Sequence, residues 1–269
     1  MFVAKPVPVA RAVPLVRENR LFMGNPGTGK STLINCMVGR AVFRSGLAWG
    51  GGLTQEYQKY IANDIAYMDT PGLADQTILR KAAEAITMAL SQPGTYKLFF
   101  MVRLQNGRVV SDDLATIERV LDSIDMDNIP FSILINNLGK RQYDTLMKLG
   151  PEFKQVATLI NSGKYSTPHI FFIPTFEGLE EQDNKIITLP DEAIGFIAND
   201  APSVTIDGGA VSDIDLLGYE QQSQRLKGEI EELRRNQAAF EAKMFQLEVQ
   251  HQVQLELMRM RQHKRCAVM

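Results

Sequence analysis

Short apolar runs alternate with amphipathic stretches between residues 19 and 200. The runs are almost continuous in Ile, Leu, Phe and Val, which is typical of strands that are buried on both faces. This alternation predicts an α/β fold, with a doubly wound, mostly parallel sheet covered by helices on both faces and followed by a long C-terminal helix. The predicted strands are 20–23, 65–68, 98–104, 131–135 and 169–173, and the predicted helices are a stretch after Lys30 and 79–90, 112–124, 152–160 and 191–198.

The segments on either side of this domain have a different pattern. Prolines interrupt residues 1–18, which predicts a flexible N-terminal arm. Residues 201–212 contain one proline and the pair Gly208-Gly209, which predicts a linker. No apolar run reaches the roughly 18 residues of a membrane-spanning helix, so we expect the chain not to cross a bilayer.

Residues 213–263 predict a long helical or coiled-coil arm, because glutamine, glutamate, arginine and leucine dominate a stretch without proline. An apolar stripe repeats along it with a seven-residue period and weakens beyond Leu247. Such a stripe requires cover, so we expect the arm either to pair with a second copy or to fold back onto the preceding domain. The stripe comprises Leu216, Tyr219, Leu226, Ile230, Leu233, Phe240, Met244 and Leu247, with Gln237 interrupting it.

Composition narrows the possible functions. The 269 residues are 45% hydrophobic, enough for a globular core. Lysine and arginine number 29 against 31 acidic residues, and the resulting net charge of −2 argues against a nucleic-acid partner. The two cysteines, Cys36 and Cys266, are too few for a disulfide framework, so we expect an intracellular, cytoplasmic protein.

A phosphate-binding loop occupies the junction of the first predicted strand and helix. Its glycines allow backbone N–H groups to surround phosphates, Lys30 would reach the β and γ phosphates, and the Ser31 hydroxyl would bind Mg²⁺. We therefore predict nucleotide binding here. The candidate binding residues are Gly24, Asn25, Pro26, Gly27, Thr28, Gly29, Lys30, Ser31 and Thr32.

A second motif, Asp69-Thr70-Pro71-Gly72, ends the strand predicted at 65–68. Asp69 is expected to hold Mg²⁺, usually through water, and the Gly72 N–H to lie beside the γ-phosphate. Thr54, after a run of three glycines, is our candidate for the switch threonine that senses Mg²⁺ and the γ-phosphate. The predicted catalytic groups are thus Lys30, Thr54 and Gly72, and the predicted metal ligands are Ser31, Thr54 and Asp69.

These motifs and their spacing resemble the GIMAP-type proteins, the immune-associated, septin-like nucleotide-binding GTPases. The resemblance covers about residues 20–200 and includes the segment Thr54-Gln55-Glu56-Tyr57-Gln58-Lys59 between the two motifs. It implies GTP or GDP as the bound nucleotide, Mg²⁺ as cofactor, and nucleotide-dependent homodimerisation through the domain at 19–200.

Two positions depart from the pattern of common GTPases. Asn136-Asn137-Leu138-Gly139 stands where Asn-Lys-x-Asp reads guanine, so Asn136 and Asn137 remain candidate base contacts but no aspartate follows them. Leu73 stands where a glutamine orients the attacking water, which predicts slow, partner-assisted hydrolysis, with Arg44 and Arg103 as possible donors. The alternatives are an ATP-using P-loop NTPase and a structural tether that binds nucleotide without turnover.

The chain ends in Cys266-Ala267-Val268-Met269, which matches a C-a-a-X prenylation box of the farnesyl type. One lipid chain binds membranes only marginally, so a second signal is required. Arg259, Arg261, Lys264 and Arg265 would supply it at an anionic lipid surface. We therefore expect residues 264–269 to be a basic, lipidated tail that attaches the protein to the cytosolic face of a membrane.

Overall fold

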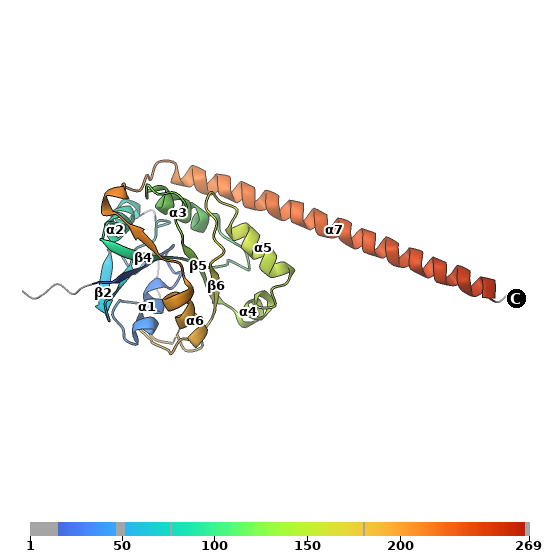
Figure 1. Ribbon diagram of the computed structural model, residues 1–269, viewed down its shortest axis with the longest axis horizontal. Helices are drawn as coiled ribbons and strands as arrows, with labels where there is room; N and C mark the ends of the chain where they lie inside the picture. The colour runs from blue at the N-terminus through green and yellow to red at the C-terminus, as the bar shows by residue number, and fades with distance from the viewer. Residues whose placement is uncertain (1–15, 47–51, 76, 180, 267–269) are drawn as a thin grey trace, which may run out of the picture.

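The computed structural model describes residues 16–46, 52–75, 77–179 and 181–266, the stretch 247–266 as backbone only (Figure 1). A seven-stranded sheet has the order β2-β3-β1-β4-β5-β6, with β7 paired to β4. Neighbouring strands are parallel except for two antiparallel pairs, β2 with β3 and β7 with β4. The strands are β1 (Glu18–Met23), β2 (Gln58–Ala62), β3 (Ile65–Asp69), β4 (Gly94–Val102), β5 (Ser132–Leu138), β6 (Ile170–Pro174) and β7 (Val204–Ile206).

Helices cover both faces of this sheet and divide the core into two clusters. On β1, Leu21 belongs to the cluster under α2, α3 and α5, whereas the next residue, Phe22, belongs to the cluster under α1 and the π-helical turn at Phe196–Asp200. Burial on both faces explains the continuous apolar strand sequences. The helices are α1 (Lys30–Val38), α2 (Leu79–Leu90), α3 (Ser111–Asp122), α4 (Lys140–Leu146), α5 (Pro151–Ile160), α6 (Asp191–Gly195) and α7 (Tyr219–Cys266), with a π-helical turn η1 (Phe196–Asp200) and a 3-10 turn η2 (Gly208–Ala210).

The predicted α/β fold class, with its parallel sheet and long C-terminal helix, is confirmed. Strand β7 and the turn η2, which lie in the predicted linker, were missed, and so were β2 and α4. Strand β2 is a half-buried edge strand. Asn63 and Asp64 in the following turn both have positive φ (50° and 62°), as a tight hairpin requires. The Asn-Asp pair was therefore a signal of this hairpin that is visible in the sequence. Helix α4 has one buried residue, Leu146, and so lacks a clear apolar period.

Two predicted boundaries are wrong. Residues 201–212 are not a linker, because β7 lies within them and pairs with Gly94–Tyr96 of β4, burying Val204 and Ile206. Its three consecutive β-branched residues outweigh the surrounding proline and glycines. Strand β1 begins at Glu18, inside the predicted arm at 1–18, whose first fifteen residues lie outside the described part of the chain.

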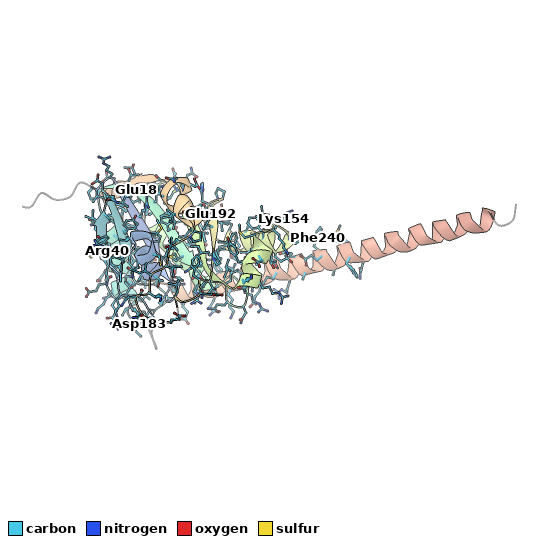
Figure 2. All side chains as sticks on the ribbon, turned by 90° about the horizontal axis from the view of Figure 1, so that it is seen from below. Glu18, Arg40, Lys154, Asp183, Glu192 and Phe240 are labelled. Carbon is cyan, nitrogen blue, oxygen red and sulfur yellow. The ribbon has the colours of Figure 1, made fainter. Side chains whose placement is uncertain are left out.

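Helix α7 begins on the domain and then leaves it. Its first turns pack against α3 and bury Tyr219, Leu226 and Ile230, which confirms that the apolar stripe folds back. Further along, α7 projects away from the sheet (Figures 1 and 2), and Phe240 and Phe245 are 66% and 67% exposed. Pairing of this outer part with a second copy stays a prediction. Among the described residues, no helix has the length and apolarity needed to cross a membrane.

Candidate functional site

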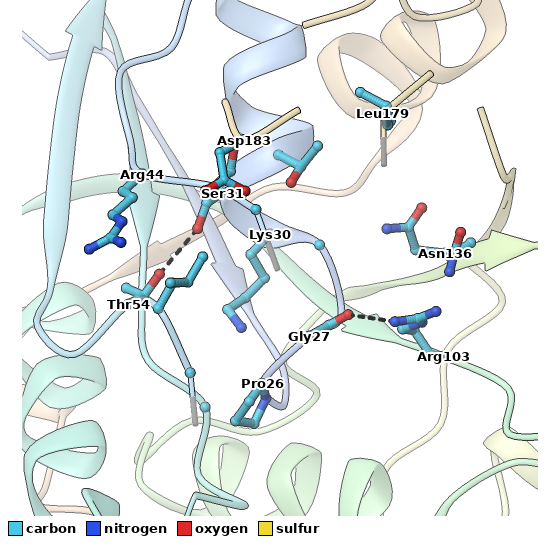
Figure 3. A pocket seen from close by; sticks show the side chains of 18 of the residues that line it. Pro26, Gly27, Lys30, Ser31, Arg44, Thr54, Arg103, Asn136, Leu179 and Asp183 are labelled. Atoms are coloured by element: carbon cyan, nitrogen blue, oxygen red, sulfur yellow. Dashed lines mark hydrogen bonds between the residues drawn. The ribbon is translucent and has the colours of Figure 1, made fainter. Parts of the chain in front are cut away.

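A pocket of about 500 Å³ lies at the carboxyl ends of the parallel strands, where ligands bind in open α/β sheets (Figure 3). It brings together the loop after β1, the segment containing Thr54, the turn after β3, the end of β5 and the loops after β4 and β6. The lining residues include Pro26, Gly27, Gly29, Lys30, Ser31, Thr32, Arg44, Thr54, Gly72, Arg103, Asn136, Asn137 and Asp183.

The phosphate-binding loop has the backbone that its glycines were expected to allow. Gly24 has φ 137°, and a Cβ there would lie 2.2 Å from the carbonyl oxygen of Met101 on β4. Gly29, at φ 91°, is the N-cap of α1 and makes no side-chain cap, so the first backbone N–H groups of α1 remain available for an anion. The loop therefore forms a phosphate cradle at a helix N-terminus.

Lys30 is buried beneath this cradle and still lines the pocket. Its Nζ donates hydrogen bonds to the carbonyl oxygens of Gly24 (2.8 Å) and Asn25 (3.2 Å). Burial lowers the pKa of Lys30, and the nearby carboxyl groups of Asp69 and Asp113 oppose that shift. A phosphate would favour the charged ammonium and could replace the carbonyl acceptors.

Ser31, Thr54 and Asp69 converge, although they come from three separate segments. Ser31 Oγ lies 2.5 Å from Asp69 Oδ2, Thr54 Oγ1 lies 3.1 Å from the same oxygen, and the two hydroxyls are 3.1 Å apart. Asp69 Oδ1 is buried without a hydrogen-bond partner among the described residues. Burial raises the pKa of Asp69, opposed first by Lys30 and then by its hydrogen bonds. A compact set of hard oxygen ligands with one unsatisfied carboxylate oxygen fits Mg²⁺.

The turn after β3 lies directly against the phosphate-binding loop. A Cβ on Gly72 would be 2.4 Å from Pro26 Cδ and 2.6 Å from Pro26 N, so only glycine permits this approach. The next side chain, Leu73, is fully buried in the core and does not line the pocket. Residue 73 is therefore directed away from the place where a water-orienting group would act.

Asn25 lies in the loop, but its side chain points away from the pocket. Its Nδ2 donates to Asp113 Oδ1 at 2.7 Å, and its Oδ1 accepts from Ala74 N at 3.2 Å and from Thr116 Oγ1 at 3.0 Å. Asn25, Thr28 and Gly24 do not line the pocket, unlike the other six candidate residues of the loop. The structure thus gives the Asn25 side chain a supporting position beneath the loop.

Both candidate base contacts line the pocket, and both are already hydrogen-bonded. Asn136 Nδ2 donates to the carbonyl oxygen of Thr28 at 2.8 Å, which braces the phosphate-binding loop. Asn137 has φ 60°, and its Oδ1 accepts from Thr175 Oγ1 at 3.0 Å, which joins the end of β5 to the loop after β6.

The loop after β6 contributes residues that were not among the candidates predicted from the sequence. Asp183 supplies the one carboxylate among the described residues that line the pocket, and Gly46 lies so close that a Cβ there would be 2.0 Å from Asp183 Oδ1. The adjacent Asn184 exchanges two hydrogen bonds of 2.8 Å with the backbone of Ser45. No motif marks this loop, and only the fold brings it to the segment after α1.

Two arginines considered from the sequence also line the pocket. Arg103 Nη1 donates to the carbonyl oxygen of Gly27 at 3.0 Å, on the opposite side of the loop from Arg44 (Figure 3). The predicted lipidation site is far from this pocket in the chain. Cys266 is the last residue of α7, its side chain lies outside the described part, and so do residues 267–269.

Comparison with known proteins agrees with the phosphate-binding loop. Residues 19–137 match the family model described as 50S ribosome-binding GTPase. Similar solved structures include Era in complex with MgGDPNP and 16S ribosomal RNA (20% identity, 59% of this chain and 51% of that chain, TM-score 0.40) and Toc33 from Arabidopsis thaliana (15% identity, 71% and 88%, TM-score 0.46). NFeoB from S. thermophilus with GDP.AlF4⁻ and K⁺ is 14% identical over 74% of this chain and 65% of that chain, with a TM-score of 0.40.

This chain thus spans about half of the Era chain and less than two thirds of the NFeoB chain. With TM-scores below 0.5, we base no conclusion on these three likenesses. The assignment rests on the family match, the loop between β1 and α1, and the Asp-Thr-Pro-Gly turn after β3. Residues 19–137 of this chain match this family model and have the fold of a P-loop GTPase.

Proposed function

We propose that this protein binds GTP with Mg²⁺, hydrolyses it slowly, and acts as a switch or scaffold at a cytosolic membrane surface. The observation that carries the nucleotide part is the convergence of Ser31, Thr54 and Asp69 beside Lys30 at the rim of the phosphate cradle. The direct test is to denature freshly purified protein and identify the released nucleotide by chromatography and mass spectrometry. Recovery of GTP or GDP supports the proposal, and binding of neither would refute it.

Each residue has a defined task in this proposal. The backbone N–H groups at the start of α1 bind phosphate oxygens, and Lys30 adds a positive charge between the β and γ phosphates. Ser31, Thr54 and Asp69 would hold Mg²⁺, which neutralises charge on the phosphate oxygens. The Gly72 N–H would donate to the γ-phosphate, and the close approach of Gly72 to the loop at Pro26 supports this role.

Slow hydrolysis follows from the position of Leu73. A fully buried leucine cannot orient the attacking water, so the rate depends on a group from elsewhere. Arg44 and Arg103 line the pocket and are candidate donors, and a dimer partner is another source. We expect turnover well below about 1 s⁻¹ for monomeric protein, the low end for typical enzymes. Fast single-turnover hydrolysis by protein shown to be monomeric would contradict this.

An ATP-using P-loop NTPase is the second candidate, because Gly139 provides no carboxylate for guanine. Competition of unlabelled GTP and ATP against a fluorescent GDP analogue separates the two candidates. A nucleotide-binding tether without turnover is the third. Single-turnover assays with excess protein, followed for hours, separate slow hydrolysis from none.

The GIMAP-type resemblance supports nucleotide-dependent homodimerisation through the GTPase domain. Light scattering of the full chain with GDP and with a non-hydrolysable GTP analogue tests it. A mass that doubles only with the analogue supports the proposal, and one mass in both states contradicts it.

Membrane attachment rests on the C-terminal sequence Cys266-Ala267-Val268-Met269 and the four basic residues that precede it. We expect farnesyl on Cys266, detected by mass spectrometry of protein from its native cell. Cys266→Ser should move the protein to the soluble fraction whichever nucleotide is bound. Unchanged membrane fractionation of Cys266→Ser would contradict the anchor.

A further inference from the structure

The side chain of Asn25 joins three parts of the domain. Through Oδ1 it accepts a hydrogen bond from Ala74 N, two residues after Gly72, and a second one from Thr116 on α3. Its own carbonyl oxygen accepts from Lys30 Nζ (3.2 Å) and from the Thr28 hydroxyl (2.9 Å). Movement of this one residue would therefore displace both the phosphate-binding loop and the segment after Asp-Thr-Pro-Gly.

Helix α7 completes this network through its first residue. The Tyr219 hydroxyl lies 3.0 Å from Thr116 Oγ1 and 3.2 Å from the carbonyl oxygen of Asp112. The backbone N–H of Ala74 can only donate, so the side-chain atom of Asn25 that it contacts is the amide oxygen Oδ1 and not the amide nitrogen. Thr116 then donates its single hydroxyl hydrogen to Asn25, and the single hydroxyl hydrogen of Tyr219 is shared between Thr116 Oγ1, the nearer acceptor, and the carbonyl oxygen of Asp112. The hydrogen bonds run in one direction, from α7 to the loop.

The Tyr219 hydroxyl is not needed merely to hold α7 on the domain. Ser223 donates a hydrogen bond to Asp112, and Gln222 and Arg225 both donate hydrogen bonds to Glu118 of α3. Leu226 and Ile230 are buried in the core beside them. Among the described residues of α7, Tyr219 provides the one side chain that reaches the Thr116–Asn25 pair.

We propose that Tyr219 is a positioning residue for the phosphate-binding loop, and that seating of α7 on α3 is thereby coupled to the nucleotide preference of the site. This rests on the proposed function, because the coupling is expressed as nucleotide affinity. The chain Tyr219–Thr116–Asn25 holds Ala74, and with it Gly72, close to the loop. That arrangement suits a γ-phosphate contact from Gly72, so losing it should weaken binding of a GTP analogue more than binding of GDP. By linkage, the GTP analogue should in turn stabilise the seating of α7.

The test uses the full chain and measures dissociation constants for GTPγS and GDP. Tyr219→Phe removes the hydroxyl and keeps the buried ring, and Thr116→Val removes the next hydroxyl. We expect each to raise the ratio of the GTPγS constant to the GDP constant about five- to tenfold, at the low end of the usual range of allosteric coupling. The double variant should do no more than the stronger single variant, and Thr116→Ser should restore the ratio.

Two control variants separate positioning from general loss of stability. Ser223→Ala removes an α7–α3 hydrogen bond outside the Asn25 network, and Tyr96→Phe removes a buried hydroxyl bonded to the carbonyl oxygens of Ala89, Leu90 and Gln92. Both variants should keep the ratio of the GTPγS and GDP dissociation constants within about twofold of the wild-type ratio. This should hold even if they lower the urea midpoint of unfolding as much as Tyr219→Phe. An unchanged ratio in Tyr219→Phe would overturn the proposal and leave Tyr219 as an anchor only.

A readout without nucleotide keeps this test distinct from that of the proposed function. Hydrogen exchange of the Ala74 amide in nucleotide-free protein should be at least threefold faster in Tyr219→Phe than in Ser223→Ala. Equal exchange rates would overturn the positioning role. If the wild-type chain bound neither GTPγS nor GDP, the proposed function would fail, whereas the exchange rates would still decide whether Tyr219 positions the loop.

Discussion

Ser31 Oγ donates a 2.5 Å hydrogen bond to Asp69 Oδ2, which joins the first turn of α1 to the last residue of β3. Thr54 approaches the same carboxylate from a third segment. These polar groups satisfy one another where a cation would bind, while Asp69 Oδ1 has no partner among the described residues. A metal ion entering with nucleotide would exchange these hydrogen bonds for coordination and would satisfy the remaining oxygen.

The first prediction concerns Mg²⁺. Chelation of Mg²⁺ should weaken GDP binding to the wild-type chain, and Asp69→Asn should remove most of that response, because metal-site changes typically alter affinity about 10- to 100-fold. GDP titrations with Mg²⁺ and with EDTA measure the response. Asp64→Asn, in the exposed turn after β2, is the control and should respond like wild type. A full Mg²⁺ response in Asp69→Asn would contradict the assignment.

The second prediction concerns Lys30. Lys30→Ala should weaken nucleotide binding about 100-fold, because hydrogen bonds to charged groups contribute about 1.5–3 kcal/mol each and no other lysine lines the pocket in the described part. Fluorescence titration with a labelled GDP measures the loss. Lys59→Ala, on the edge strand β2, should bind like the parent. Equal affinity of Lys30→Ala and the parent would remove the central assignment.

The third prediction uses two glycines. Gly72→Ala places a methyl group 2.4 Å from Pro26 Cδ, so we expect a stability loss of about 1–3 kcal/mol and displaced loop geometry with weaker nucleotide binding. Gly195→Ala meets nothing within 4 Å and lies at the end of α6, so it should be neutral or stabilise by up to about 1 kcal/mol. Urea unfolding measures the stability of the two variants, and GDP titration measures their nucleotide affinity. Wild-type binding by Gly72→Ala would show that the close approach is dispensable.

The fourth prediction tests where α7 is seated. Leu226 and Leu233 share a heptad position, but Leu226 is fully buried against the domain and Leu233 is 37% exposed. Leu226→Ala should lower the free energy of unfolding by about 2–5 kcal/mol. Leu233→Ala should lower it by less than about 1 kcal/mol in the monomer. Similar losses in both variants, measured by urea unfolding at low concentration, would mean that the outer stripe is also covered.

The fifth prediction is a pH dependence from Asp113. Burial raises the pKa of Asp113 to about 7, and Asp112 adds to the shift while Asn25 and Lys30 oppose it. The folded state therefore retains a proton that the unfolded state releases above its ordinary pKa of 3.8. Stability contributed by this group is present at low pH and is lost as pH rises toward 7, with a slope of at most about 1.4 kcal/mol per pH unit. Urea unfolding between pH 4.5 and 8 measures the free energy of unfolding of the wild type and of Asp113→Asn, and the variant should lack this slope. If the two free energies changed with pH in parallel, the assignment of the slope to Asp113 would be wrong.

Sequence alone determined the five parallel strands of the sheet and the phosphate cradle. Strands buried on both faces have continuous apolar sequences, so β1, β3, β4, β5 and β6 were recognisable without a neighbour being known. The glycines around Lys30 and the Asp-Thr-Pro-Gly turn were equally readable, because their backbone requirements are local. The long helix α7 was recognisable from its composition and length.

Tertiary structure decided which surfaces meet. The apolar stripe of α7 showed that cover was needed, but α3 was identified as the cover only by the contacts of Tyr219, Leu226 and Ile230. Likewise Asn25 matched a binding motif, whereas its side chain lies beneath the loop because Thr116 and Ala74 supply partners there. A sequence pattern reports that a group must be buried or hydrogen-bonded. Which distant residue satisfies it depends on the packing of the whole chain, and here that packing joins α7 to the phosphate-binding loop.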